Sequence, residues 1–145
     1  MVTMLERVQA MIRGEAPDPP VARLVGFRLV EVAPGSAVFE MEAGPQHTNP
    51  MGTLHGGILC DIADAAMGIA YASTLEEGES FTTLELKINF LKPVWNARLR
   101  AVGRLVKRGK TVGMAECDVV DETGSLIARA SSTCLTLSGK QAAGR

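Results

Sequence analysis

One long apolar segment constrains the fold of this chain more than any other feature of its sequence. Between Gly56 and Ser73 the apolar residues recur at helical spacing and cover nearly every face of the helix that this spacing predicts. They are Ile58, Leu59, Ile62, Ala63, Ala65, Ala66, Met67, Ile69 and Ala70. A helix that is apolar on most of its faces must be buried, so the remaining segments have to surround it.

The segments on either side of this helix alternate apolar and polar residues, which is the two-residue period of a half-buried strand. Leu84, Leu86, Ile88 and Phe90 follow this period directly after the acidic residues 76–79. Further strands are expected at 27–31, 37–42, 98–106, 111–120 and 125–137, with short turns at 33–36, 108–110 and 121–124.

The N-terminal segment predicts a short amphipathic helix from Met4 to Ile12, which the Asp-Pro-Pro sequence at 18–20 brings to an end. Helix, two strands, buried helix and further strands together predict an α+β fold, with an antiparallel sheet of five or six strands wrapped around one central helix. The 145 residues suit a single domain, 1–145, in which residues 1–20 are an N-terminal helix and linker and residues 138–145 are a flexible tail.

Bulk composition excludes several classes of protein. The chain is 46% hydrophobic, which supports a packed core, and its net charge of −1 favours neither nucleic acid nor a membrane surface as a partner. Cys60, Cys117 and Cys134 lie far apart without a CxxC motif, so we expect neither a disulfide framework nor a metal site. The N-terminus lacks the pattern of a signal peptide, and reduced thiols predict a cytoplasmic protein. We expect no cofactor.

Two carboxylates interrupt the apolar helix. Asp61 and Asp64 are the only formally charged residues between Glu42 and Glu76. Burial raises the pKa of a carboxylate and makes it a competent base or nucleophile near neutral pH, and we expect Asp64 to lie in a semi-dry pocket. The alternative is that each aspartate lies at the helix edge in water. The two share one side of the helix, and at most one of them need be catalytic.

The helix begins at the sequence His55, Gly56 and Gly57. Backbone N–H groups in a first turn have no partner within the helix and lie at the positive end of its dipole. Glycine lets a ligand approach that backbone closely, so this turn can bind a carbonyl oxygen as it becomes an oxyanion. An ordinary glycine-rich entry to a helix would have the same sequence.

Residues 47–73, HTNPMGTLHGGILCDIADAAMGIAYAS, resemble the PaaI-like (phenylacetate-pathway) branch of the hotdog-fold acyl-coenzyme A thioesterases. The pattern of that branch is H-x-N-x-x-G-x-x-H-G-G followed by an acid on the helix. The match is dense in this segment and continues more loosely through LKINFLKPV and VKRGKT to about Leu137. The resemblance implies a hotdog fold and an enzyme that hydrolyses an acyl-coenzyme A thioester.

This resemblance implies that the backbone N–H of Gly56 polarises the thioester carbonyl and that Gly57 helps to bind the substrate. In the family the acid lies eight residues after this first glycine, which here is Asp64. Asp64 would attack the carbonyl or activate the attacking water, and both roles stay open. Some aryl-thioesterase relatives carry a glutamate as the acid and a hydroxyl one turn later, where this chain has Gly68, which weakens any transfer of their aryl substrate.

Three further residues receive roles from the resemblance. Asn49 would hold the attacking water or the thioester group. Thr83 resembles a hydroxyl that positions the water, and Thr82 is an alternative because the preceding loop varies in length. His55 would brace the loop by hydrogen bonding rather than transfer protons.

Eight basic residues follow one another without an acid between Glu85 and Glu116; they are Lys87, Lys92, Arg98, Arg100, Arg104, Lys107, Arg108 and Lys110. Solvated strand faces account for such a run, above all at Arg98 and Arg100. The hairpin residues Lys107, Arg108 and Lys110 are the candidates for binding the phosphates of coenzyme A.

Two other functions stay open. One is a hotdog dehydratase or (R)-specific enoyl-coenzyme A hydratase, which would use His47 or His55 as its base. The other is a non-catalytic acyl-coenzyme A-binding module, although pure binding gains little from a buried carboxylate. Medium-chain and aryl groups are both open as the acyl part of the substrate.

A sheet wrapped around one helix leaves an edge strand uncovered. Hotdog relatives pair such edges in a homodimer, often as a dimer of dimers, and their active site spans the dimer interface. We therefore expect at least a homodimer and leave a homotetramer open. In it Asn49 and Gly56 of one subunit would face Asp64 of the other.

Overall fold

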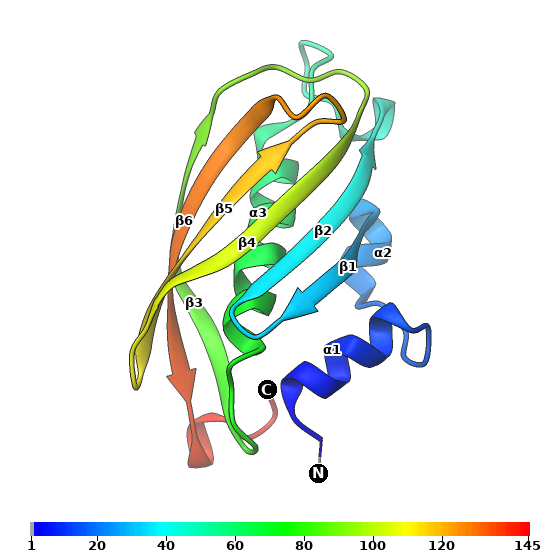
Figure 1. The fold of residues 1–145 in the computed structure, drawn as a ribbon. Coiled ribbons are helices and arrows are strands. Elements are labelled where there is room, and N and C mark those ends of the chain that lie inside the picture. The colour runs from blue at the N-terminus through cyan, green and yellow to red at the C-terminus, as the bar shows by residue number, and fades with distance from the viewer. Residues whose placement is uncertain (1) are drawn as a thin grey trace.

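The predicted apolar helix, α3 (Gly56–Ala72), lies at the centre of the computed structural model, which describes residues 2–145. Figure 1 shows one sheet curving around this helix. All its strands pair antiparallel in the order β1-β2-β4-β5-β6-β3. They are β1 (Phe27–Ala33), β2 (Ser36–Ala43), β3 (Ser80–Phe90), β4 (Ala97–Arg108), β5 (Val112–Val120) and β6 (Leu126–Leu137). The predicted α+β architecture is confirmed, with six strands.

The sheet approaches α3 closely because the helix presents small side chains to it. The buried face includes Ala63, Ala66 and Ala70 together with the larger Ile62 and Met67, all fully shielded from solvent. A Cβ atom at Gly103 in β4 would lie only 2.5 Å from the backbone oxygen of Ala66, so even an alanine there would force the layers apart. Full burial of a side chain of the size of Ile62 or Met67 contributes about 1.5–3 kcal/mol.

One face of α3 stays uncovered because the two edge strands of the sheet, β1 and β3, do not meet. Asp61 and Asp64 lie on this face, and both residues are exposed. The expected burial of the Asp64 carboxylate is therefore wrong for the single chain, although Asp64 lines a mostly apolar cavity. The apolar residues of α3 favoured burial of the whole helix. The open sheet, however, covers only the faces of the helix that carry no charge.

Two helices precede the sheet, and Figure 1 shows both on the side of β1. The predicted helix α1 (Met4–Ile12) begins with a capping box, in which the Thr3 hydroxyl accepts a hydrogen bond from the Glu6 N–H and the Glu6 carboxylate accepts one from the Thr3 N–H. A second helix, α2 (Pro20–Val25), was not expected. Proline is tolerated as a first helical residue, where its missing N–H would have no partner, so the proline pair that follows one helix also begins the next.

The other segments are short. Single 3-10 turns, η1 (Pro45–His47) and η2 (Gly139–Gln141), lie before α3 and in the C-terminal tail. Within the described residues, no helix is both long enough and apolar enough to cross a membrane. Cys60, Cys117 and Cys134 are all free thiols.

Candidate active site

The acid of the candidate site is paired with a hydroxyl from the neighbouring strand. Thr83 in β3 donates a hydrogen bond from Oγ1 to Oδ1 of Asp64 at 3.2 Å. Thr83 faces the helix because it pairs with the buried Cys134 of β6, whereas Thr82 points to the other face of the sheet. The strand register shifts immediately afterwards, between Thr83 and Glu85, and such bulges re-aim side chains beside functional sites.

Asp61 lies on the same side of α3, one turn before Asp64. The pKa of Asp61 is raised above its ordinary value, first by partial desolvation on the helix and then by the negative charge of Asp64. The two carboxylates therefore sense each other electrostatically, but only Asp64 has the threonine partner. In the part of the chain that the structure describes, no three His, Cys, Asp or Glu side chains group closely enough to hold a metal ion.

A cavity of about 260 Å³ opens beside Asp64 and Thr83. Helix α2, strands β1, β2 and β3 and the uncovered face of α3 all contribute to its walls, which are mostly apolar. Residues of the N-terminal segment therefore line this cavity, although the family pattern begins only at residue 47. The sequence offered no motif for these wall residues, because only the fold brings α2 next to the middle of α3.

A second part of the site lies at the start of α3. His55 precedes the helix and its Nδ1 accepts a hydrogen bond from the Gly57 N–H at 2.9 Å, so this imidazole caps the helix. Among the described residues, the Gly56 N–H has no hydrogen-bond partner. A Cβ atom at Gly56 would lie 2.8 Å from Cζ of Phe90. Gly56 therefore presents the free backbone donor, and the N–H of Gly57 is already engaged.

Asn49 shares a cleft of about 410 Å³ with Gly56. Its Oδ1 accepts hydrogen bonds from the N–H groups of Met51 and Thr53 at 3.0 and 3.1 Å, and its Nδ2 donates to Oγ1 of Thr53 at 2.8 Å. The side chain thus shapes its own loop, and one amide hydrogen is left for a ligand. Sequence patterns do not reveal such local bonds.

His47 has a structural role. It is 5% exposed, its Nε2 lies 2.6 Å from the carbonyl oxygen of Val25, and its Nδ1 accepts a hydrogen bond from the Gly44 N–H at 3.1 Å. Both ring nitrogens are therefore engaged, which ties the loop before α3 to the end of α2. A general base needs a free ring nitrogen, so His47 is not available for the dehydratase chemistry considered above.

The glycine and acid parts of the site are too far apart to act together within one chain. Gly56 and Asp64 are eight residues apart in α3, which is about 12 Å at a rise of about 1.5 Å per residue. A reacting carbonyl has to lie within about 3 Å of both the oxyanion donor and the attacking group. Within one chain these two parts, the candidate half-sites, therefore cannot act on the same carbonyl.

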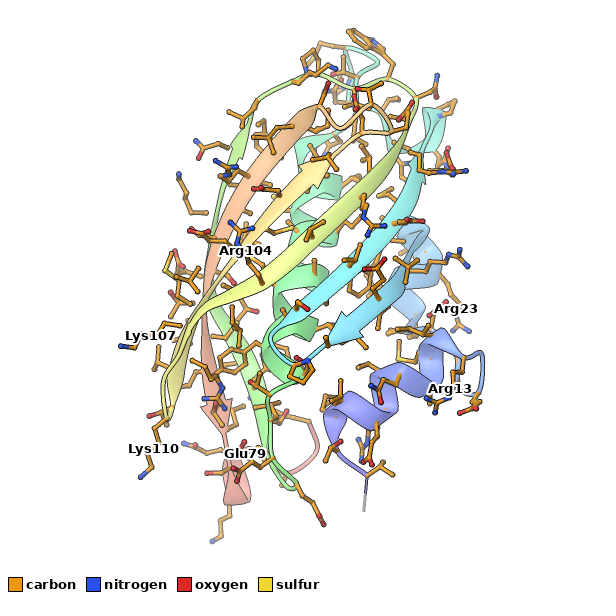
Figure 2. All side chains as sticks on the ribbon, viewed as in Figure 1. Arg13, Arg23, Glu79, Arg104, Lys107 and Lys110 are labelled. Atoms are coloured by element: carbon orange, nitrogen blue, oxygen red, sulfur yellow. The ribbon has the colours of Figure 1, made fainter. Side chains whose placement is uncertain are left out.

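The basic hairpin between β4 and β5 divides into two kinds of residue. Arg108 is engaged within the chain, since its Nε donates to Oγ1 of Thr74 at 3.0 Å and its guanidinium lies 4.6 Å from the ring centre of Tyr71. Lys107 and Lys110 point away from the sheet into solvent (Figure 2). Strand pairing places Arg108 level with Thr83, three strands away across the sheet. At about 4.8 Å between neighbouring strands, the backbones of these two residues are about 14 Å apart.

Arg98 and Arg100 pair with acids of strands β1 and β2. Arg98 lies 2.7 Å from Glu42, and Arg100 lies 3.0 and 3.1 Å from Glu31 and Glu40. The prediction of solvated strand faces at these two arginines is confirmed. Such exposed pairs contribute little to stability, and they leave the hairpin lysines as the better candidates for an anionic ligand.

Comparison with known proteins gives a consistent result. The profile of the thioesterase superfamily matches residues 51–128. Human acyl-coenzyme A thioesterase 13 is 29% identical over 136 residues, which make up 92% of this chain and 96% of the human protein. Both matches include α3 with Asp64.

Two solved structures show the same fold. One, described as a thioesterase related to phenylacetic acid degradation from Ralstonia eutropha JMP134, is 35% identical with a TM-score of 0.80, over 88% of this chain and 98% of that one. The other, the PaaI protein of E. coli, has a TM-score of 0.82 over 94% of this chain and 98% of that one. The second is 22% identical and is compared for its fold alone.

Proposed function

The chain belongs to the thioesterase superfamily and has its hotdog fold, and we infer that it hydrolyses an acyl-coenzyme A to a free acid and coenzyme A. The observation that carries this proposal is the Asp64–Thr83 pair, with its 3.2 Å hydrogen bond, at the rim of an apolar cavity. A carboxylate held by a hydroxyl beside an apolar chamber is suited to attack on a bound acyl group. The human relative, an acyl-coenzyme A thioesterase, supports the same substrate class.

In the proposed reaction the thioester carbonyl oxygen lies against the N–H of Gly56, which stabilises the negative charge of the tetrahedral intermediate. Asp64 either removes a proton from an attacking water or attacks the carbonyl carbon itself and forms an anhydride that water then hydrolyses. In both routes the C–S bond breaks and coenzyme A leaves as the thiol after gaining a proton. Thr83 holds the Asp64 carboxylate, and His55 fixes the turn that carries Gly56.

Release of a thiol from an acyl-coenzyme A tests this function directly. The purified chain is incubated with octanoyl-coenzyme A, free thiol is followed with a thiol reagent, and the free acid is identified by chromatography. A hydratase would instead add water to an enoyl-coenzyme A without releasing thiol, and a binding module would do neither. Absence of thiol release from short, medium, long and aryl substrates would contradict the proposal.

The two half-sites predict that the active form is at least a dimer. Gly56 of one subunit would then meet Asp64 of the other. The strand β3 is an edge of the sheet, and its residues Leu84 and Phe90 are 56% and 55% exposed. An edge strand with exposed apolar side chains favours pairing with a second copy. We expect sedimentation to show a dimer or a dimer of dimers, and a stable, fully active monomer would contradict this arrangement.

A charged substitution on this edge separates assembly from folding. Leu84→Lys should oppose pairing, shift the chain toward monomer and lower activity in proportion to the monomer fraction. Leu24→Lys is the matched control, because Leu24 is 85% exposed on α2 and does not line the cavity. It should change neither sedimentation nor activity.

Replacement of the hairpin lysines should weaken substrate binding without slowing the chemical step. If Lys107 and Lys110 hold the phosphates of coenzyme A, the double change to alanine should raise KM about tenfold and leave kcat near that of the wild type, the signature of lost uniform binding. The effect should shrink with a truncated pantetheine thioester that lacks these phosphates. Equal losses on both substrates would show that the hairpin is not a phosphate site.

Arg108→Ala should be measured as a separate variant. Because its guanidinium contacts Thr74 and the Tyr71 ring, Arg108→Ala also removes packing. We expect this variant to lower Tm as well as to raise KM, whereas the double lysine variant should unfold at the wild-type temperature.

A further inference from the structure

The cavity beside Asp64 has a composition that selects its ligand, if the proposed hydrolysis is correct. Its walls include Phe27, Phe39, Phe81 and Ile69. The charged groups that line it are all acidic, namely Asp18, Asp61 and Asp64; none of its lining residues in the described chain is Lys, Arg or His. An apolar chamber with acids at its rim accepts an uncharged hydrocarbon group and repels an anionic one.

A glycine inside α3 shapes this chamber. Gly68 lies one helical turn after Asp64, lines the same cavity and is buried. Glycine in a helix interior is less favourable than alanine. Here its missing side chain leaves room for the ring of Phe81, since a Cβ atom at position 68 would lie 3.3 Å from Cζ of that ring. This distance is tighter than an ordinary contact, so an added methyl group would have to displace the ring.

The ring of Phe81 also packs against the ring of Tyr71, which lies one helical turn after Gly68. The two ring centres are 5.7 Å apart. Tyr71 is completely buried, its hydroxyl lies 2.6 Å from Oγ1 of Thr136, and Arg108 covers its ring. A side chain held on three sides does not yield easily. Because Gly68 and Phe81 both line the cavity, a methyl group at position 68 would crowd the Phe81 ring and take up part of the cavity volume.

We propose that Gly68 and Phe81 together determine the length of the acyl group that the enzyme accepts, and that this group is uncharged and apolar. The cavity volume of about 260 Å³ lies just below the range of about 300–1,000 Å³ that is usual for small-molecule sites. The chamber therefore suits a hydrocarbon chain of medium length better than a long one. Asp64 at its rim would then meet the thioester carbon at the end of that chain.

Gly68→Ala is the decisive variant, because the substitution favours the helix while it narrows the chamber. The hydrolysis of straight-chain acyl-coenzyme A substrates from acetyl to dodecanoyl is measured for this variant and for the wild type. We expect kcat/KM to fall at least about tenfold for octanoyl and longer chains, the size of effect that one methylene has in an apolar pocket. Acetyl and butyryl substrates should lose less than about threefold, and Tm should not fall.

Phe81→Leu tests the same pair from the other side. The smaller side chain enlarges the chamber at the position that the Gly68→Ala methyl would narrow. The preferred chain length should therefore move upward, with the ratio of dodecanoyl to butyryl kcat/KM rising about tenfold. A fall of equal size for every chain length in both variants would show general damage and overturn the proposal.

A matched pair of four-carbon substrates tests the charge of the chamber. Butyryl- and succinyl-coenzyme A differ mainly in the terminal carboxylate of the latter. We expect the wild type to prefer butyryl by more than about tenfold, and this preference should weaken when Asp61 is changed to asparagine. Equal turnover of the two would contradict an acid-rimmed apolar chamber.

These outcomes are distinct from a failure of the proposed function. If the wild type releases no thiol from any acyl-coenzyme A, the hydrolysis itself is wrong. If it does release thiol but the chain-length profile is the same in the wild type, Gly68→Ala and Phe81→Leu, then hydrolysis stands and the role of Gly68 and Phe81 is wrong.

Discussion

Replacing Asp64 with asparagine should lower kcat by about 10²–10⁴-fold, the usual loss when a positioned acid–base group is removed. Asparagine keeps the shape of the side chain and still accepts the hydrogen bond that Thr83 donates at 3.2 Å. It removes both the base and the nucleophile, so the variant is inactive by either route. KM should change little, because the carboxylate acts on the reacting carbon and not on the bulk of the substrate. Steady-state kinetics with octanoyl-coenzyme A measures both constants.

Asp61→Asn is the matched control for this prediction. Asp61 lies on the same exposed face of α3 but lacks the threonine partner, and its raised pKa reflects partial desolvation and the charge of Asp64. Its replacement should cost less than about tenfold in kcat. Equal losses in the two variants would show that Asp64 is not the catalytic carboxylate. The same conclusion would follow if Asp64→Asn kept more than about a tenth of wild-type kcat, a change of only about 1.4 kcal/mol in the barrier.

The central helix and the strands were predictable because local patterns determine them. The apolar period identified α3 to within one residue of its observed end, and the alternation in 83–90 identified most of β3. The sequence left Thr82 and Thr83 as alternatives for the water-positioning hydroxyl. The alternation of apolar and polar residues marks the strand but does not give the length of the loop before it. The pairing of Thr83 with the buried Cys134 separates the two geometrically.

Other features of the site depend on contacts between distant segments, and no local pattern encodes them. Helix α2 begins at the second residue of a proline pair that predicts the end of a helix, and it lines the cavity only because the fold brings it to α3. The sequence predicts Arg108 as a cation available to phosphate. In the structure its guanidinium bonds to Thr74 and lies over the ring of Tyr71, both more than thirty residues earlier in the chain. The apolar helix predicts a buried Asp64, but the residue is exposed in the single chain. Any further burial depends on a second subunit, which the sequence pattern of one chain does not describe.

The N–H of Gly56 is the second group whose loss should be severe, and proline removes it with little damage to the fold. Gly56 is the first residue of α3, where proline is tolerated. His55 already has φ −65° and ψ 133°, the extended conformation that a residue before proline requires. Gly56→Pro should lower kcat by about 10²–10³-fold, the usual loss of one oxyanion donor.

Gly56→Ala is the control for steric effects in this experiment. Both substitutions add a Cβ atom 2.8 Å from Cζ of Phe90, so both crowd that ring to the same extent. Alanine keeps the N–H and should therefore retain most of the activity. Equal losses in the alanine and proline variants would show that crowding by the side chain, and not the missing donor, causes the defect.

Mixing the two inactive variants then tests whether each site is shared between subunits. In a mixed dimer of Asp64→Asn and Gly56→Pro chains, one site combines both lesions and the other combines an intact Gly56 N–H with an intact Asp64. Random exchange makes about half of the dimers mixed, each with one of its two sites intact, so about a quarter of wild-type activity should return in a symmetric dimer. A site built within one chain would carry one lesion in every copy. In that case mixing would restore nothing, and the separation of about 12 Å between the two half-sites along α3 would have to be bridged by a change in conformation.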